Sequence, residues 1–430
     1  MKHNKLTIDA ELEKLQHEAF HYFLHEANPA NGLVRDKTAS DWPASIAATG
    51  VALACYPIGV ERGFMSRSEA VDRTLTTLRF FWNSPQGPEP DATGYKGFYY
   101  HFLDMQTGRR AWQCELSTVD TTFLLAGMLT ARIYFDANTA KEQEIRTLAE
   151  ALYHRCDWQW AQNQGETVTH GWKPESGFLP YRWEGYDEAM LLYILGLGSP
   201  TYPLPESSYA AWATTYEWKR IYDYDYLYSG SLFTHQLSHI WIDFRNIQDA
   251  FMREKGCDYF ENTRRATYIQ RQYAIDNPLN FVGYSACCWG ITASDGPGPE
   301  VLKINGVERR FYNYIARSVP YGPDDGTIAP WAAVASLPFA PDIVLPMIDH
   351  CIYKLKLKEG NRYGFKATFN LTFPSRWISP WHYGINQGPI VLTTENYRTG
   401  LMWRLMRTCP YFTKGLKRAG FTGGYLSESL

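Results

Sequence analysis

The sequence predicts an all-α fold in which six inner helices are wrapped by six outer helices within one domain. Twelve segments place apolar residues at helical spacing. Segments that are apolar on every side alternate with segments that carry one apolar stripe, and these patterns are typical of buried and surface helices respectively. No low-complexity segment or Gly/Ser-rich linker divides the 430 residues, which favours a single domain.

The predicted helices fill most of residues 8–408, the core of a domain expected to cover 1–430. In chain order they are 8–27, 43–62, 66–83, 117–135, 139–163, 186–197, 206–220, 231–244, 257–276, 329–339, 341–356 and 388–407. The segments 45–60 and 189–197 are nearly all apolar, whereas 139–163 is charged on one side. We therefore expect a set of apolar side chains from the inner helices to be buried, namely Ile46, Val51, Leu53, Leu124, Leu125, Leu191 and Leu192.

Composition and charge exclude several classes of partner. The formal net charge is −3 and no basic run occurs, so nucleic acid is not an expected partner. The N-terminal stretch lacks an apolar signal region, and the apolar stretch 45–60 is too short and too rich in Gly and Ala to span a bilayer. We expect no membrane association and a cytoplasmic location, or a periplasmic one if a signal has been removed.

The cysteines and histidines do not predict a metal site. Eight cysteines occur without a C-x-x-C spacing, which favours buried free thiols over structural zinc. His235 and His239 are four residues apart but have no evident third ligand, so cleft or core histidines are expected. Nucleotide-binding glycine motifs are also missing, and no cofactor is expected.

Glu115 precedes a clearly marked helix in ELSTVDTTFLLAG (115–127). Ser117 is the expected N-cap and Asp120 occupies the third helical position, which is the pattern of a capping box. The helix N-terminus favours an ionised carboxylate, and Arg109 and Arg110 would have the same effect. The simpler alternative is a surface acid on a loop.

Glu188 repeats this arrangement in GYDEAMLLYILGLG, where Asp187 and Glu188 are expected in the first turn of an apolar helix. A simple structural role is available for acids at that place, because they interact favourably with the helix dipole. However, Trp183 and Tyr186 lead directly into the segment. Two carboxyl groups beside aromatic rings fit glycoside hydrolysis, which needs one acid to protonate the leaving oxygen and one carboxylate to activate water or attack carbon.

Aromatic residues make up 16% of the chain and several gather in long, otherwise polar loops. Core packing explains most of them. Long loops in a compact domain are usually functional or disordered, and disorder seldom contains so many aromatic residues. We expect five tryptophans to converge on one cleft and stack on sugar rings, namely Trp172, Trp183, Trp289, Trp377 and Trp381.

Eight segments, in order, carry a resemblance that runs from about residue 15 to 408. They are EANPANGLVRD (26–36), SIAATGVALACYPIGVERG (45–63), GFYYHFLD with TGRR and ELSTVDTTFLLAG (97–127), GWKPESGFLPYRWEGYDEAMLLYILGLGSPTYPL (171–204), DYFENTRRATYIQRQYAIDNP (258–278), WGITASDGPG (289–298), DDGTIAPWAAVASLPFAP (324–341) and GINQGPIVLTTENYRTGL (384–401). With these segments the chain resembles the bacterial glucoamylase-like (glycoamylase) domain family and is similar to the endo-β-1,2-glucanases of glycoside hydrolase family 144.

The resemblance implies a single-domain (α/α)6 barrel and hydrolysis of β-glucan, with β-1,2-glucan or its oligosaccharides as substrate. It places Glu115 and Glu188 as the catalytic pair, supported by Asp104, Asp120 and Asp187. We expect Glu115 to be ionised as the base, and Glu188 to have a raised pKa and act as the acid. The resemblance favours inversion, for which the two carboxyl groups lie roughly 6.5–9.5 Å apart.

The expected substrate-binding residues come from the same loops and segments. They are Arg109, Trp172, Arg182, Trp183, Tyr186, Asn262, Trp289, Asp295, Trp377, Trp381, His382 and Glu395.

Three alternative functions remain open from the sequence. A transglycosylase would transfer glucosyl units on the same barrel, and a sugar epimerase would use histidines such as His239 and His382 as its acid and base. A non-catalytic glucan-binding protein would bind oligosaccharide without turnover. Analysis of the products distinguishes all three from hydrolysis.

Overall fold

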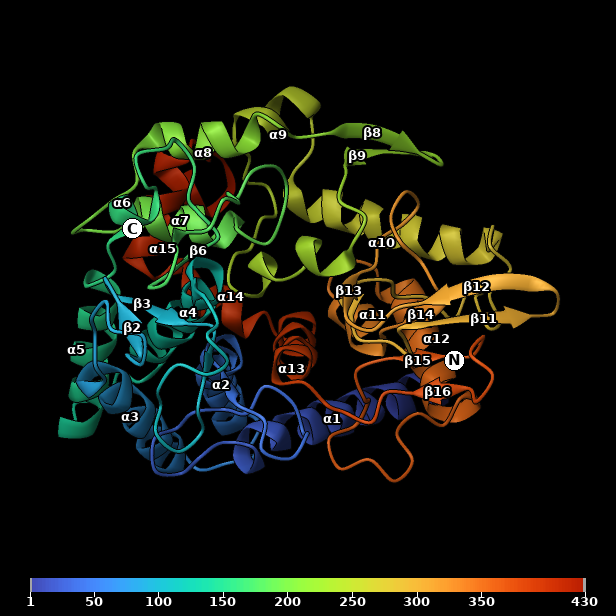
Figure 1. The fold of residues 1–430 in the computed structure, drawn as a ribbon, viewed down its shortest axis with the longest axis horizontal. Coiled ribbons are helices and arrows are strands. Elements are labelled where there is room, and N and C mark those ends of the chain that lie inside the picture. Colours follow the sequence, from blue (N-terminus) through green and yellow to red (C-terminus); the bar gives the residue numbers. More distant parts are fainter. Residues whose placement is uncertain (1, 428–430) are drawn as a thin grey trace.

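Helices dominate the computed structural model, which describes residues 2–427 (Figure 1). The α-helices are α1 (Lys2–His25), α2 (Ile46–Glu61), α3 (Arg67–Asn83), α4 (Thr118–Tyr134), α5 (Ala140–His154), α6 (Trp158–Ala161), α7 (Met190–Gly198), α8 (Glu206–Ala213), α9 (Ala250–Lys255), α10 (Tyr259–Asp276), α11 (Pro330–Ala335), α12 (Pro341–Asp349), α13 (Gly384–Arg398), α14 (Leu401–Arg407) and α15 (Pro410–Arg418). The predicted helix-rich character of the chain is confirmed.

The two expected kinds of helix are both present. Every residue of α7 and α11 is buried, and α2, α4 and α13 are buried over nearly their whole length. In contrast, α3, α5 and α10 each bury one face. The seven side chains predicted to be buried are confirmed as such, each being at most 1% exposed: Ile46, Val51, Leu53, Leu124, Leu125, Leu191 and Leu192.

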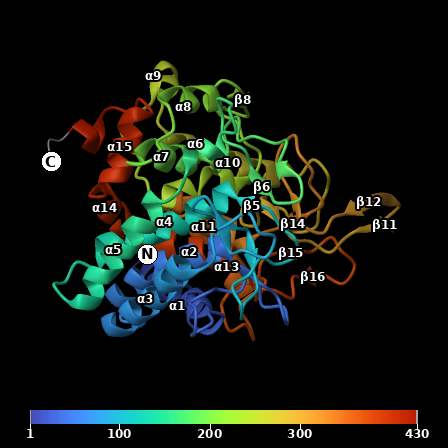
Figure 2. The same cartoon turned by 60° about the vertical axis from the view of Figure 1, so that its left-hand side comes forward.

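The buried helices are neighbours of one another. Helix α2 packs against α4 and α13, α4 packs against α7, and α11 packs against α13, which lies near the centre of Figure 1. The helices that bury only one face lie outside them. Helix α5 packs against the buried helix α4 and against α3, and α1 packs against α13. Figure 2 shows the same grouping after rotation, with the β11–β12 hairpin projecting from the helices.

The contact between α2 and α4 depends on two glycines. A Cβ on Gly127 would lie 1.9 Å from the carbonyl oxygen of Gly50, and a Cβ on Gly50 would lie 2.4 Å from Cα of Leu124. Because a side chain at either position would overlap backbone atoms, only glycine permits this distance between the two helices.

Several predicted helices are wrong in part. The segments 139–163 and 388–407 each form two helices, α5 and α6 in the first and α13 and α14 in the second. The helix expected at 206–220 ends at Ala213, and the chain continues into a hairpin of β8 (Trp218–Ile221) and β9 (Tyr224–Leu227). Alternating aromatic residues there favour strands. The segment 231–244 forms two 3₁₀ helices, Leu232–His235 and Ser238–Ile240, instead of an α-helix. Its hydroxyl groups bond to backbone groups, as when Thr234 Oγ1 donates to the Ser231 carbonyl, and such bonds compete with helix formation.

The expectation of a purely helical protein also needs correction, because small antiparallel sheets are present. The largest contains, in spatial order, β2 (Gly94–Tyr95), β3 (Phe98–Tyr100), β5 (Leu116–Ser117), β6 (Gly171–Lys173) and β7 (Gly177–Phe178). The remaining strands are β1 (Ala44–Ser45), β4 (Phe102–Leu103), β10 (Ala293–Ser294), β11 (Glu300–Ile304), β12 (Val307–Phe311), β13 (Ile315–Ala316), β14 (Thr327–Ile328), β15 (Phe369–Asn370) and β16 (Trp377–Ile378). These strands lie in loops between helices and leave the helical core uninterrupted.

The main hydrophobic core takes residues from Leu12 to Leu426, and it includes Phe412 and Leu416 of α15. The core therefore extends beyond residue 408. Within residues 2–427, none of the helices combines the length and the apolar character needed to cross a membrane.

We predict that Gly127→Ala destabilises the protein by about 3 kcal/mol, the upper part of the usual range for overpacking, because backbone atoms of α2 must move. This exceeds the gain of about 1 kcal/mol expected when glycine becomes alanine within a helix. The measurement is denaturant unfolding. Gly196→Ala in α7 is the matched control, since the nearest atoms to its new Cβ belong to the Leu204 side chain and not to the backbone, and it should cost less. Equal costs for both variants would contradict the account.

Candidate active site

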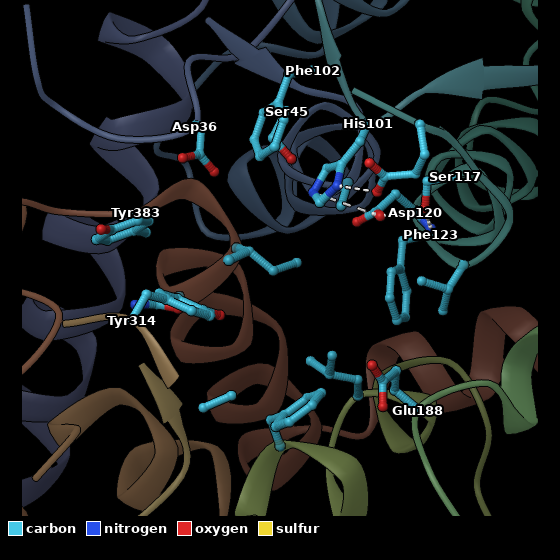
Figure 3. Close-up of a pocket in the computed structure, with 18 of the residues that line it drawn as sticks. Asp36, Ser45, His101, Phe102, Ser117, Asp120, Phe123, Glu188, Tyr314 and Tyr383 are labelled. Atoms are coloured by element: carbon cyan, nitrogen blue, oxygen red, sulfur yellow. Dashed lines mark hydrogen bonds and ion pairs between the residues drawn. The ribbon is translucent and has the colours of Figure 1, made fainter. Parts of the chain in front are cut away.

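A cleft of about 670 Å³ opens where the N-terminal ends of the buried helices meet (Figure 3). Its walls include a residue within two positions of the first residue of each of α2, α4, α7, α11 and α13. These residues are Ser45, Ser117, Glu188, Trp331 and Tyr383. Helix N-termini carry partial positive charge and unpaired N–H groups, so this end of the helices suits carboxylates and polar ligands.

The register of two strands brings His101 and Glu115 together. In the antiparallel pair β3–β5, Tyr100 is opposite Leu116, so the next residues outward are His101 and Glu115. The His101 amide donates to the Glu115 carbonyl at 3.0 Å, and His101 Nδ1 lies 2.8 Å from Glu115 Oε1. The His101 ring stacks on Phe102, with ring centres 4.0 Å apart.

The predicted N-cap of α4, Ser117, is confirmed, and its bonds to Asp120 hold that side chain beside the same histidine. The Asp120 amide donates to Ser117 Oγ, and Ser117 Oγ donates in turn to Asp120 Oδ2 at 2.5 Å. Asp120 Oδ2 is also 3.6 Å from His101 Nε2. His101 therefore lies between two carboxylates, one at each ring nitrogen (Figure 3).

This arrangement shifts the pKa values of His101 and Glu115 in opposite directions. Burial lowers the pKa of His101, but Asp120 and Glu115 together raise it more, to about 9. Burial raises the pKa of Glu115, but the hydrogen bond and charge of His101 outweigh this and hold it below its ordinary value. At neutral pH, His101 is a cation and Glu115 is an anion.

Glu188 faces this group from across the cleft, near Phe123 (Figure 3). Burial and the nearby charge of Asp120 raise the pKa of Glu188 to about 7. Asp187 and Glu188 lie in a turn before α7 instead of in its first helical turn, as α7 begins at Met190. Oδ1 of Asp187 accepts hydrogen bonds from the Ala189 amide and Trp212 Nε1, so Asp187 supports this turn.

Aromatic and charged groups form the rest of the cleft. Trp183 stacks on His170, with ring centres 3.8 Å apart, and its Nε1 donates to Thr118 Oγ1. Trp42 Nε1 donates to Asp36 Oδ2 at 3.0 Å. Asp36, Tyr314 and Tyr383 lie together away from Glu188 in Figure 3.

Of the seventeen predicted site residues, four line the cleft: Glu115, Glu188, Asp120 and Trp183. Three expected residues belong instead to exposed or structural loops. Asp104 is exposed and accepts bonds from the backbone of Gln106 and Thr107. Arg109 is exposed and binds the Asp91 carbonyl, and Arg182 donates to the carbonyls of Gln162 and Thr167.

Three further expected residues are buried away from the cleft. Trp289 is fully buried in the core. Asn262 is also fully buried and exchanges hydrogen bonds with the backbone of Leu227. Glu395, 2% exposed on α13, accepts two bonds from Arg62, so its charge is already paired.

The remaining expected residues lie in neighbouring loops without lining the cleft. They comprise Trp172 in β6, Trp377 in β16, Trp381, Tyr186, Asp295 and His382. Asp295 accepts bonds from Thr368 and Ser379. The five tryptophans thus do not converge as expected, because strand pairing and core packing occupy most of them.

The histidines of the epimerase alternative are also outside the cleft. Burial lowers the pKa of His239 to about 3 and that of His382 to about 4. Both side chains are less than 7% exposed. They are neutral and shielded from a ligand in the cleft, which disfavours an acid–base pair at these positions.

His101 was absent from the predicted site, as were Asp36, Trp42, Tyr314 and Tyr383. His101 lies in GFYYHFLD (97–104), fourteen residues before Glu115, but the β3–β5 register decides whether its side chain faces Glu115. Among the residues that the structure describes, His101, Glu115 and Asp120 form a set whose possible ligand atoms lie within 4.8 Å of one another. Both nitrogens of His101 already face carboxylates, so a metal would have to displace these interactions.

Comparison with known proteins identifies related sequences over nearly the whole chain. The model of the glycoamylase family, described as "putative glucoamylase", matches residues 180–410. An exo-β-1,2-glucooligosaccharide sophorohydrolase (non-reducing end) of Parabacteroides distasonis is 29% identical over 96% of this chain. This chain spans 58% of that relative's length.

Two solved structures are similar over nearly their full length. One from Bacteroides uniformis, with the same glucoamylase description as the family, has a TM-score of 0.87 and 32% identity, covering 97% of this chain and 99% of that one. An endo-β-1,2-glucanase from Chitinophaga pinensis, in complex with sophorotriose and glucose, has a TM-score of 0.86 and 25% identity over the same shares.

The raised pKa of His101 predicts a pH-dependent contribution to stability. A cation with a pKa of about 9 in the folded state and about 6.5 in the unfolded state stabilises the fold fully below pH 6.5, and the effect disappears as the pH rises through about 9. Denaturant unfolding at pH 6 and pH 10 should therefore show His101→Gln to be more destabilising at pH 6. His25→Gln, at an exposed position on α1, is the control and should show no such excess. An equal loss at both pH values for His101→Gln would contradict the ion pairing.

Proposed function

The chain belongs to the glycoamylase family, and from this membership and the geometry of its cleft we propose that it is a glycoside hydrolase acting on β-1,2-glucan or its oligosaccharides. One observation carries the proposal: two carboxyl groups face one cleft in opposite states of ionisation. The pKa of Glu188 is raised to about 7, whereas that of Glu115 is lowered. Two-carboxylate glycoside hydrolysis needs this difference.

In the proposed mechanism, Glu188 is the general acid. Its neutral form, retained up to about pH 7, protonates the glycosidic oxygen as the bond to the anomeric carbon breaks. Asp120 supports this role because its negative charge disfavours ionisation of Glu188.

Glu115 is the proposed base. Its carboxylate takes a proton from water as the water attacks the anomeric carbon, so the products are two shorter sugars and configuration is inverted. His101 is a positioning residue, as its hydrogen bond orients Glu115 and its charge keeps Glu115 ionised. Asp187 holds the turn that carries Glu188 through its bonds to Ala189 and Trp212.

The proposed architecture is a single-domain (α/α)6 barrel spanning the chain. Helices α2, α4, α7, α11 and α13 would provide five inner positions. The 3₁₀ segment 232–240 would provide the sixth, because Ser238 Oγ accepts from the Leu191 amide of α7 and Gln236 Nε2 donates to the Ala332 carbonyl of α11. The continuous core from Leu12 to Leu426 supports one domain.

The substrate class follows from the cleft lining and the relatives. Trp42, Phe102, Trp183, Tyr314 and Tyr383 offer ring faces beside carboxyl and hydroxyl groups, a combination that suits sugar rings with apolar faces and polar edges. The proposal of a β-1,2 linkage rests on the similarity of the chain to the sophorohydrolase and the endo-β-1,2-glucanase.

We predict that Glu188→Gln and Glu115→Gln each lower kcat on linear β-1,2-glucan by about 10²–10⁴-fold, the usual value of acid–base catalysis. Glutamine keeps the size of the side chain, so circular dichroism should be unchanged. Glu89→Gln, on an exposed loop, is the control and should remain active. A folded variant that keeps more than about a tenth of the wild-type rate would remove that residue from the mechanism.

Product chromatography in the same assay separates the alternatives. Hydrolysis gives shorter glucans only. Longer products would indicate transglycosylation, an isomerised monosaccharide would indicate epimerisation, and binding without turnover would indicate a glucan-binding protein. Each of these three results would overturn the proposal.

The pKa of Glu188 predicts the alkaline limb of the pH profile. Because Glu188 must be protonated, kcat/KM should fall as the pH rises through about 7. Asp120→Asn removes a charge that raises this pKa, so the limb should move to lower pH. Asp91→Asn, an exposed acid paired with Arg109, is the control and should leave the limb unchanged. An unmoved limb in Asp120→Asn would contradict the assignment of Glu188 as the acid.

A further inference from the structure

The loop that leads to Glu115 displays a large aromatic side chain at the edge of the cleft. Trp112 is 57% exposed. Its ring contacts two residues that line the cleft, with ring centres 4.7 Å from Trp42 and 5.2 Å from Phe102. The aromatic lining of the cleft thus continues outward onto Trp112.

The backbone of this loop is strained where it presents Trp112. Trp112 and Gln113 have φ values of 55° and 53°, so two consecutive non-glycine residues adopt the left-handed conformation. That conformation is unfavourable for a bulky side chain and persists only where the surroundings impose it.

Arg110 supplies this restraint. Its side chain is 2% exposed and donates from Nε to the Cys114 carbonyl at 2.6 Å and from Nη2 to the Gln113 carbonyl at 2.8 Å. Its Nη1 also pairs with Glu175 Oε1 at 2.6 Å, and the guanidinium lies 4.7 Å from the centre of the Tyr100 ring. A buried cation therefore holds the loop in a conformation that leaves an indole in solvent.

We propose that Trp112, together with Trp42, forms a glucosyl-binding subsite at the mouth of the cleft, on the Glu115 side. This inference rests on the proposed function. The occupant is a sugar unit of the same β-1,2-glucan chain whose reacting units lie between Glu115 and Glu188. The apolar C–H face of this sugar unit would cover the exposed face of the Trp112 indole. The edge contact with Trp42 holds that indole in its orientation.

The subsite has a consequence for chain length. Only a glucan long enough to reach from the two carboxyl groups to the cleft mouth can occupy it. Trp112 therefore increases kcat/KM for long chains and contributes nothing for the shortest substrates.

The test measures kcat/KM on β-1,2-glucooligosaccharides of increasing length and on long linear β-1,2-glucan. Trp112→Ala should lower kcat/KM by about tenfold on the long chain, a typical loss when a contacting tryptophan is truncated. On the shortest cleaved oligosaccharide it should be within about twofold of wild type, since that substrate does not reach Trp112. Trp112→Phe, which keeps an aromatic ring, should recover part of the loss.

Trp82→Ala is the matched control, because Trp82 is 44% exposed on α3 and lies against Arg155 away from the cleft lining. It should behave as wild type on every length. If Trp112→Ala loses activity equally on all lengths, Trp112 serves only to hold the Glu115 loop, and the subsite is overturned. No loss on any length also overturns it. If the wild-type protein cleaves none of the β-1,2-glucans, the proposed function is wrong, independently of the subsite.

Discussion

The cation of His101 stands between Glu115 and Asp120, and the electrostatics of the cleft follow from that position. The histidine keeps Glu115 ionised, while Asp120, held by Ser117, disfavours charge on Glu188 across the cleft. This network thus lowers the pKa of Glu115, and its Asp120 adds to the burial that raises the pKa of Glu188. Acid–base catalysis needs groups poised in this way.

The irregular parts of the chain build this network on a rigid helical frame. The N-termini of the buried helices lie at the cleft. The glycine contact between α2 and α4 sets the distance between these two helices. Between these ends, the two-residue strand β5 fixes Glu115 opposite His101 and passes directly into the cap of α4. The strand pairing, although small, is therefore what connects the frame to its chemistry.

Local features of the sequence predicted local structure well. Ser117 and Asp120 are three residues apart and form a cap that depends on nothing distant, so the start of α4 was predictable. Burial of Leu191 and Leu192 followed equally from an unbroken apolar run. The helix-rich character of the fold was also predictable, because helical periodicity repeats along the whole chain.

Residues whose roles depend on distant partners were not predictable in the same way. His101 meets Glu115 only through strand register, which the sequence does not encode locally. Conversely, Trp289, Asn262 and Glu395 have the side chains of a binding site, but the core and its hydrogen bonds satisfy them. Residue type alone does not distinguish a group that binds a ligand from one that holds the fold together.

The central claim is that Glu188 is a neutral carboxylic acid at pH 6 while Glu115 is ionised. Infrared difference spectroscopy between wild type and Glu188→Gln, recorded across pH 5–9, observes the C=O stretch of a protonated carboxyl directly. The account predicts a band present in wild type, lost as the pH rises through about 7, and missing from Glu188→Gln. If Glu188→Gln shows the same band, no difference band appears at pH 6, and that result would contradict the neutral state of Glu188.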